Sequence, residues 1–325
     1  MKLASSAFQL LGSLLSPAGP RARLSILIYH RVVPAEDALF PSLPTAQAFD
    51  RQIRALAEQF NVLPLAEAIA RLRERSLPAR AACITFDDGY ADNAEVALPI
   101  LQRHGCPATF FIATDFLDGG RMWNDTVIEI VRRASGPRLD LTGIGLGCRD
   151  IATNAQRRQV IRSLLHELKY LPHSQRAEQV ARIAQTAGGP LPNDLMMTSG
   201  QVRGLYEAGM EIGGHTGSHP ILARLDNTAA TAEIAAGKEA LEAIIRTPVR
   251  FFAYPNGKPG EDYTAEQVRA VRALGFEAAL TTASGVATAG SDLYQLPRFT
   301  PWDRTMLKFS LRLQANLRRT QPDKV

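Results

Sequence analysis

The stretch Ile84-Thr85-Phe86-Asp87-Asp88-Gly89-Tyr90 is an apolar run that ends in two adjacent acids and a glycine. Its first half predicts a buried strand, so Asp87 and Asp88 are expected at the carboxyl end of that strand. Two neighbouring carboxylates are costly to keep ionised together unless a metal ion or a cation compensates their charge. The rest of the sequence is therefore expected to supply metal ligands or a cation for these two acids.

Segments with the pattern of strands alternate with segments that have the pattern of helices along most of the chain. Strands are expected at residues 25–30, 82–86, 107–113, 210–215, 250–254, 276–281 and 293–298, and helices at 46–60, 65–75, 92–104, 198–208, 227–246 and 264–274. This alternation is typical of an α/β protein with a parallel sheet and helices outside it.

Residues 117–189 interrupt the alternation and are interpreted as an insertion. They contain an expected helix at 122–134, an alternating patch around 139–142 and two charged helices at 153–170 and 174–187. We predict an amphipathic segment at residues 1–20, a catalytic domain at 21–303 that carries the insertion, and a basic helix and tail at 304–325.

Composition limits the class of protein. The 325 residues are 46% hydrophobic and 21% charged, which excludes disordered and collagen-like chains. Three dispersed cysteines do not make a disulfide framework, and no run reaches the ~20 apolar residues of a membrane span. The net charge of +5 comes without a nucleic-acid motif, so we expect no nucleic-acid partner.

The termini bear on location. Residues 1–20 hold one lysine and an apolar run broken by Gln9, which makes a poor secretory signal. The apolar residues fit an amphipathic helix: Leu3, Phe8, Leu10, Leu11, Leu14 and Leu15. We expect a cytoplasmic or membrane-peripheral protein, with peripheral membrane contact through the terminal helices; export by a weak N-terminal signal is the alternative.

The segment His215-Thr216-Gly217-Ser218-His219 places two imidazoles four residues apart, and its glycines and Pro220 favour a loop after a strand. Two histidines with one carboxylate make the His2Asp type of open metal site. Either motif alone is ambiguous. Together, at the carboxyl ends of parallel strands, they indicate a metal site, because barrel enzymes assemble active sites at that rim.

The segments Thr85-Phe86-Asp87-Asp88-Gly89 and His215-Thr216-Gly217-Ser218-His219 resemble the first and second motifs of the polysaccharide deacetylases, carbohydrate esterase family 4, with the NodB homology fold. The resemblance extends over residues 25–299, with a poor match in the insertion. It implies a distorted parallel (β/α) barrel of the polysaccharide deacetylase type with an inserted helical segment.

The resemblance also implies roles for the site residues. Asp87 is the general base, and Asp88, His215 and His219 bind one divalent ion; Zn²⁺ is favoured, and Co²⁺, Ni²⁺ or Fe²⁺ could take the same ligands. Such an ion polarises the amide carbonyl and lowers the pKa of bound water to about 7. The implied activity is hydrolytic removal of N-acetyl groups from amino sugars of a polysaccharide, oligosaccharide or glycolipid.

Ile28-Tyr29-His30-Arg31-Val32 resembles a circularly permuted subgroup that includes the poly-N-acetylglucosamine deacetylases, in which the late histidine motif stands at the N-terminus. No Leu-x-His remains near the C-terminus, consistent with that permutation. The resemblance makes His30 the general acid for the leaving nitrogen. The alternative is a hydrogen-bonded histidine at a strand end.

The third motif departs from the family pattern. Phe252-Ala253-Tyr254-Pro255-Asn256-Gly257 has alanine where the family's Arg-Pro-Pro-Tyr-Gly has arginine. Arg298 is our first candidate to replace that arginine beside Asp87, and Arg250 is the second. A surface role is the alternative for both.

Substrate contacts are expected from the same motif and from the insertion. The backbone N–H of Tyr254 is a candidate oxyanion donor, with Pro255 and Asn256 beside it. Trp123 is a candidate for stacking on a sugar ring, and packing in the core is its alternative.

Two other functions stay open at this point. The missing third-motif arginine suggests a catalytically impaired glycan-binding protein of the same fold. An O-acetyl esterase is the other, because attack by a metal-activated water also suits esters.

Overall fold

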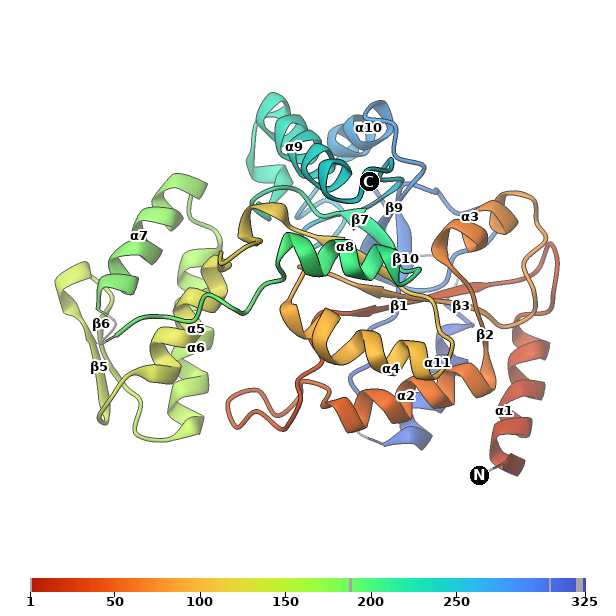
Figure 1. Ribbon diagram of the computed structural model, residues 1–325, viewed down its shortest axis with the longest axis horizontal. Coiled ribbons are helices and arrows are strands. Elements are labelled where there is room, and N and C mark those ends of the chain that lie inside the picture. Colours follow the sequence, from red (N-terminus) through yellow and green to blue (C-terminus); the bar gives the residue numbers. More distant parts are fainter. Residues whose placement is uncertain (1, 187–188, 304, 320–323) are drawn as a thin grey trace.

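The computed structural model describes residues 2–186, 189–303, 305–319 and 324–325 (Figure 1). Within these residues, an eight-stranded sheet lies at the centre of the molecule in the order β1-β3-β4-β7-β8-β9-β10, with β2 beside β3, and every pairing in it is parallel. The strands are β1 Leu24–Tyr29, β2 Asn61–Val62, β3 Ala81–Phe86, β4 Thr109–Ile112, β7 Glu211–Gly214, β8 Phe251–Ala253, β9 Ala278–Ser284 and β10 Leu296–Arg298.

The first and last strands of this order meet. The N–H of Phe299, directly after β10, donates to the carbonyl of Ile26 (2.7 Å), and its carbonyl accepts from the N–H of Ile28 (3.0 Å). The sheet is therefore nearly closed into a barrel, and the predicted parallel (β/α) barrel is confirmed.

Alternate residues of each strand pack into two different clusters. Ile26, Cys83 and Phe111 belong to an inner cluster that continues to α3 (Leu65–Arg73). Their neighbours Leu27 and Ile84 pack outward against the helices that cover the sheet. These are α2 Ala46–Gln59, α4 Leu98–Arg103, α8 Ser199–Glu207, α9 Asn227–Ile245, α10 Ala265–Ala273 and α11 Met306–Asn316. By this alternation, Thr85 and Asp87 share the inner face of β3.

The helix expected at 92–104 begins differently from the prediction. Asn93–Ala97 is a π-helix in which the N–H of Leu98 donates to the carbonyl of Asn93, and α4 follows it. Pro99 has no N–H to give to the preceding turn, which is the local reason for the irregular start. Elsewhere the predicted boundaries hold to within a few residues, as at α2, where the Thr45 side chain accepts from the N–H of Ala48.

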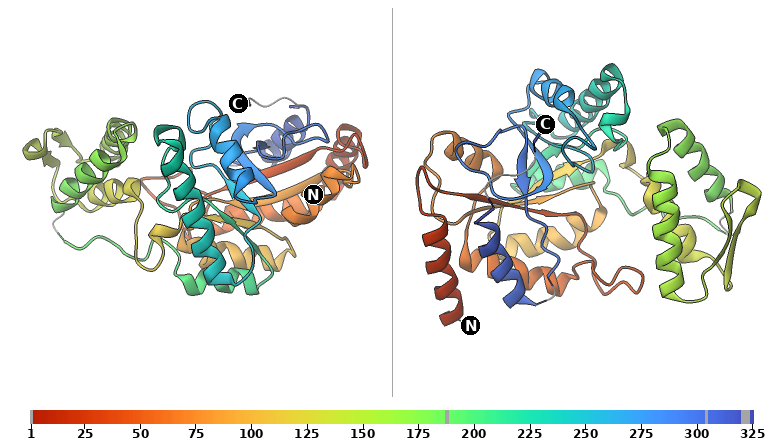
Figure 2. Two further views of the ribbon diagram at one scale, coloured as in Figure 1. Left: turned by 90° about the horizontal axis from the view of Figure 1, so that it is seen from above. Right: turned by 180° about the vertical axis from the view of Figure 1, so that it is seen from behind.

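Most of the remaining elements lie between β4 and α8, to one side of the barrel (Figures 1 and 2). They are α5 Trp123–Arg133, the antiparallel pair β5 Arg138–Leu141 and β6 Gly147–Asp150, α6 Asn154–Lys169 and α7 His173–Gln185. Val127 of α5, Ile161 of α6 and Ile183 of α7 belong to a core that the elements of the insertion share. Short 3-10 turns occur at Thr114–Phe116, Thr142–Ile144 and Leu222–Arg224. The domain boundaries given above stay a prediction.

The terminal helices lie side by side. Helix α1 (Lys2–Leu15) packs against α2 and α11 (Figure 2), and the side chain of Gln314 donates to the carbonyl of Phe8 (3.2 Å). The ends of the predicted terminal segments at residues 1, 304 and 320–323 lie outside the described residues. Among the helices that are described, none is long and apolar enough to cross a membrane.

Candidate active site

Asp87 and Asp88 directly follow β3, at the carboxyl edge of the sheet. The N–H of Asp87 donates to the carbonyl of Tyr29 (3.0 Å), so the pairing with β1 continues up to the first acid. Asp88 and Gly89 then take positive φ angles of 78° and 93°, which turns the chain sharply. A Cβ at position 89 would lie 2.9 Å from Ile112, so glycine also permits the close approach of β4. Both acids are buried.

Asp87 pairs with Arg298. Nη1 and Nη2 of Arg298 each donate to one carboxylate oxygen at 2.7 Å, and its Nε donates to the carbonyl of Thr281 (2.7 Å). Burial raises the pKa of Asp87, but the charges of Arg298 and His215 outweigh that effect and hold it below the usual value. The predicted pairing is confirmed for Arg298. Arg250 instead pairs with Glu277 at the surface (2.6 Å).

Asp88 faces the two histidines. Nε2 of His215 and Nε2 of His219 each lie 3.4 Å from Oδ1 of Asp88, and the three candidate ligand atoms are all within 4.8 Å of one another. Nδ1 of His215 lies 2.7 Å from the carbonyl oxygen of Ala253, which assigns the ring proton to Nδ1 and leaves Nε2 free to bind a metal. The alanine that replaces the third-motif arginine thus orients a ligand through its backbone.

The segment between the histidines is a loop, as predicted. Thr216 and His219 have left-handed φ angles of 68° and 53°, and the Thr216 hydroxyl accepts from the N–H of His219 (3.0 Å). Ser218 donates from its N–H and its hydroxyl to Glu233 on α9 (2.9 and 2.7 Å). Non-glycine residues in this conformation cost free energy and are concentrated at functional sites. The helix α9 therefore holds the loop in a strained form.

The donor set fits a divalent ion. One carboxylate oxygen and two imidazole nitrogens converge, and each imidazole presents the same nitrogen. Burial lowers the pKa of His219 to about 4, which keeps this imidazole neutral and able to ligate near neutral pH.

A cavity of about 340 Å³ opens above these residues, between the barrel rim and the insertion. Asp87, Asp88 and both histidines form its floor, and His30 lines it from the end of β1. His30 is exposed, and its backbone carbonyl accepts from the side chain of Asn93 (2.9 Å). The position is open to a substrate, and the role of His30 as general acid stays a prediction.

Of the four predicted substrate contacts, two line the cavity and two do not. Trp123 and Asn256 line the cavity. Tyr254 is fully buried, its ring stacks on Tyr263 (3.9 Å between centroids), and its N–H donates to the carbonyl of Leu280 (3.1 Å). The oxyanion role predicted for that N–H is therefore wrong, because the sheet ladder extends one residue beyond β8 and uses it. Pro255 is buried and does not line the cavity.

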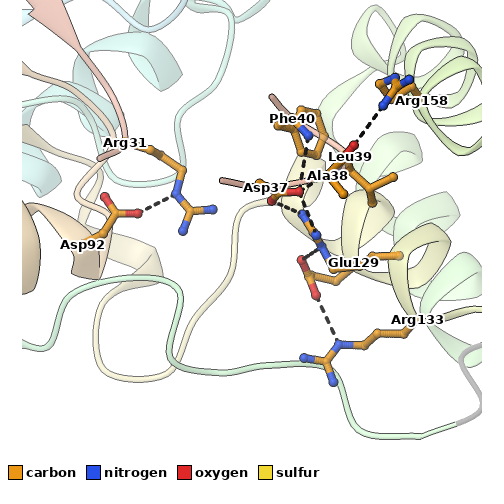
Figure 3. A network of polar contacts seen from close by, with 10 residues as sticks. Arg31, Asp37, Ala38, Leu39, Phe40, Asp92, Glu129, Arg133 and Arg158 are labelled. Carbon is orange, nitrogen blue, oxygen red and sulfur yellow. Dashed lines mark hydrogen bonds and ion pairs between the residues drawn. The ribbon is translucent and has the colours of Figure 1, made fainter. Parts of the chain in front are cut away.

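The segment after His30 is fixed to both the barrel and the insertion (Figure 3). On the barrel side, Arg31 pairs with Asp92 (2.7 Å). On the insertion side, the carboxylate of Asp37 accepts from both terminal nitrogens of Arg132 on α5. Further contacts are the donations to Asp37 from the N–H groups of Leu39 and Phe40, to Ala38 from Arg158, and to Glu129 from Arg132 and Arg133. The segment that follows His30 is thus attached both to the barrel, through Asp92, and to helix α5 of the insertion, through Arg132.

Two basic residues of the cavity wall, Lys169 and Arg176, were not predicted from the sequence. Both lie in charged stretches that were expected to be helices, where the residue pattern gives no sign that one arginine faces a site and another faces solvent. The helical spacing of the apolar residues in α7 could have indicated which face of the helix is buried, and therefore which of its arginines lies on that face.

This fold and site define the class of barrel proteins with a candidate metal-dependent hydrolase site at the strand ends. The family model for polysaccharide deacetylase matches residues 74–136 and 170–279, more than half of the sequence, and the chain belongs to that family. The unmatched residues between the two ranges lie within the insertion.

Individual relatives agree with this assignment. "Putative polysaccharide deacetylase YxkH" of Bacillus subtilis (strain 168) is 32% identical over 93 residues, which covers 28% of this chain and about a third (32%) of the relative's length. Among solved structures, Streptococcus pyogenes deacetylase PplD in complex with acetate has a TM-score of 0.61 at 19% identity and covers 90% of this chain and 98% of its own. IcaB from Ammonifex degensii has a TM-score of 0.58 at 19% identity and covers 93% and 98%. These neighbours share the fold of this chain.

Proposed function

We propose that this protein is a metal-dependent N-deacetylase that acts on an amino sugar of a polysaccharide, oligosaccharide or glycolipid. One observation carries the proposal: Asp87, which Arg298 pairs with from behind, lines the same cavity at the strand ends as the Asp88, His215 and His219 cluster.

Asp88, His215 and His219 would hold the ion. A divalent metal in this place polarises the amide carbonyl and makes a water molecule more acidic. Zn²⁺ suits one carboxylate and two imidazoles best, and Co²⁺, Ni²⁺ or Fe²⁺ are compatible with the same ligands.

Asp87 and His30 would move the protons. Arg298 keeps Asp87 ionised and fixes the plane of its carboxylate, and each oxygen retains a lone pair with which to accept a proton from the attacking water. His30 lines the same cavity and would give a proton to the nitrogen as the amide C–N bond breaks. Acetate leaves, and the sugar keeps a free amine.

The glycan-binding alternative depended on the absent third-motif arginine. That basis is weakened, because Arg298 already forms a two-bonded pair with Asp87 from a different strand. Ester hydrolysis uses the same groups, so only a choice of substrates separates it from amide hydrolysis.

The test is acetate release from N-acetylglucosamine oligomers and from O-acetylated xylan, with and without a chelator. We expect release from the N-acetylated substrate, its loss with the chelator and its recovery when Zn²⁺ is added back. Release from the xylan alone would establish an esterase, and release from neither would leave the glycan-binding alternative.

We also propose a cytoplasmic or membrane-peripheral location with contact through the terminal helices. Support comes from apolar side chains that stay exposed on α1 and α11, with Leu14 73% and Leu307 63% accessible. Co-sedimentation with anionic vesicles should fall in Leu14→Glu and Leu307→Glu and stay unchanged in Tyr206→Ser on α8. Failure of the unaltered protein to sediment with vesicles would refute the proposal.

A further inference from the structure

Arg176, on α7, lies in the wall of the active-site cavity and is only 5% exposed. Its guanidinium stacks on the ring of Trp123 (5.1 Å to the centroid), and its Nη1 donates to the backbone carbonyl of Lys169 (3.2 Å). Within the described parts of the chain, no carboxylate forms an ion pair with it. A buried charge thus borders the cavity without a counter-charge.

That arrangement is costly for the free protein. A buried guanidinium loses hydration, and a neutral carbonyl and an aromatic ring restore only part of that free energy. Burial accordingly lowers the pKa of Arg176. Arg298 shows the contrasting case, since its buried guanidinium is neutralised by the two oxygens of Asp87. The cavity position of Arg176 is explained if a ligand brings the missing anion.

The same wall carries a second cation. Lys169, the last residue of α6, is half-buried and lines the cavity. It forms no close ion pair with a described carboxylate, and Asp262 interacts with its charge only at longer range. The acidic residues that line the cavity are Asp87 and Asp88, within the described residues, and these already have Arg298 and the two histidines as partners. The wall formed by Arg176 and Lys169 therefore has positive charge available for an anion.

We propose that Arg176 and Lys169 bind a phosphoryl group attached to the amino sugar, which makes the substrate a sugar phosphate or a phosphate-linked glycan or glycolipid. This inference rests on the proposed function and specifies its substrate class. The fork of an arginine matches phosphate oxygens, and two cations match the two charges of a phosphate monoester or of a diphosphate linkage better than the single charge of a carboxylate. Trp123 lies beside Arg176, where its ring can stack on the sugar.

The size of the cavity agrees with such a ligand. Its volume of about 340 Å³ falls in the range of small-molecule sites. The cavity is lined both by the Asp88, His215 and His219 cluster and by Trp123, Lys169 and Arg176 from the insertion.

The experiment measures binding to the metal-loaded full-length protein by titration calorimetry. The probes are N-acetylglucosamine 1-phosphate, neutral N-acetylglucosamine, glucuronic acid and inorganic phosphate. We expect the sugar phosphate to bind at least about tenfold more tightly than the neutral sugar, as two charge-assisted hydrogen bonds predict. That difference should shrink with added salt.

The variants assign the effect to one side chain. Arg176→Gln should abolish the preference for the sugar phosphate over the neutral sugar, and an unchanged thermal unfolding curve would show that the variant is folded. Arg176→Lys should retain part of the preference, because it keeps the charge and loses the fork. Arg182→Gln is the matched control on the same helix, where the one hydrogen bond of Arg182 to a described residue is a long contact to the carbonyl of Gly143 (3.5 Å).

Three results would overturn the inference. Equal binding of the phosphorylated and neutral sugars, or an unchanged preference in Arg176→Gln, removes the phosphoryl site. Glucuronic acid that binds as tightly as the sugar phosphate removes the preference for phosphate. Inorganic phosphate that binds as tightly removes the link to the sugar. Because the affinity of the probes and the release of acetate are measured separately, an absence of acetate release contradicts the proposed enzyme and leaves the anion site standing.

Discussion

Arg298 donates two hydrogen bonds of 2.7 Å to Asp87, although 211 positions separate the two residues in the sequence. Both side chains are almost fully buried. Arg298 therefore does for Asp87 what the missing third-motif arginine was expected to do, but it comes from the last strand of the sheet.

Breaking this pair should be costly. Arg298→Leu leaves Asp87 buried without its partner, and we expect the free energy of unfolding to fall by about 3–5 kcal/mol in urea denaturation. Arg250→Leu is the control, because it breaks an exposed pair with Glu277 and should cost less than about 1 kcal/mol. In the double variant Asp87→Asn/Arg298→Leu most of the loss should be recovered. Similar losses in Arg298→Leu and Arg250→Leu would contradict the buried-pair account.

Removal of the proposed base and removal of a proposed metal ligand should have different effects. Asp87→Asn should keep the bound metal and lower acetate release by at least about a hundredfold, the usual contribution of a general base. His215→Ala should lose both metal and activity, since it removes one of three ligands. Metal content by mass spectrometry and acetate release on the same samples check this. Full activity in Asp87→Asn would refute the assigned base.

A glycine on α9 should matter for the histidine loop. A Cβ at Gly237 would lie 2.5 Å from the backbone carbonyl carbon and oxygen of Thr216, so Gly237→Ala should displace the loop and weaken metal binding. Gly204→Ala, on α8, is the matched control, because nothing lies within 4 Å of its Cβ; it should stabilise the protein by about 0.5–1 kcal/mol. Calorimetric titration with Zn²⁺ tests both variants, and equal affinities would disprove the steric account.

Asp125 predicts a dependence of stability on pH. Burial raises its pKa to about 7 from an ordinary 3.8, and one of its carboxylate oxygens is buried without a hydrogen-bond partner. Between these pH values the folded state keeps a proton that the unfolded state releases, so this group makes the protein less stable as the pH rises. Asp125→Asn should gain on the order of 3 kcal/mol relative to the unaltered protein between about pH 4 and about pH 8.

Urea denaturation at the two pH values measures this difference. Asp194→Asn, which removes an exposed carboxyl group, should show little change relative to the unaltered protein. Parallel pH curves for Asp125→Asn and the unaltered protein would contradict the prediction.

The features that could be predicted from the sequence are those that depend on residues close together in the chain. The strand that leads to Asp87 and the loop between His215 and His219 were recognisable, because strands and turns depend on neighbouring residues. Long-range partners were harder. Arg298 could be proposed only as one of two strand-end arginines, and tertiary pairing decided between them.

Other features depended on contacts that no local pattern reveals. The N–H of Tyr254 was misassigned because the β8–β9 ladder continues past the strand end. Arg176 was missed because the burial of one side of α7 arises from the packing of the insertion. The strand β6 was missed because its four residues carry too little pattern on their own.

The closure of the sheet through Phe299 has a consequence for biosynthesis. A ribosome makes Asp87 and Asp88 long before it makes β10, so the nascent chain holds an acid pair whose cationic partner does not yet exist. The carboxylates stay hydrated until that strand arrives, because burying them earlier is costly. The two carboxylates at this rim can thus be buried only when nearly the whole polypeptide has been translated. A chain that stops before Arg298 lacks the cation that pairs with Asp87.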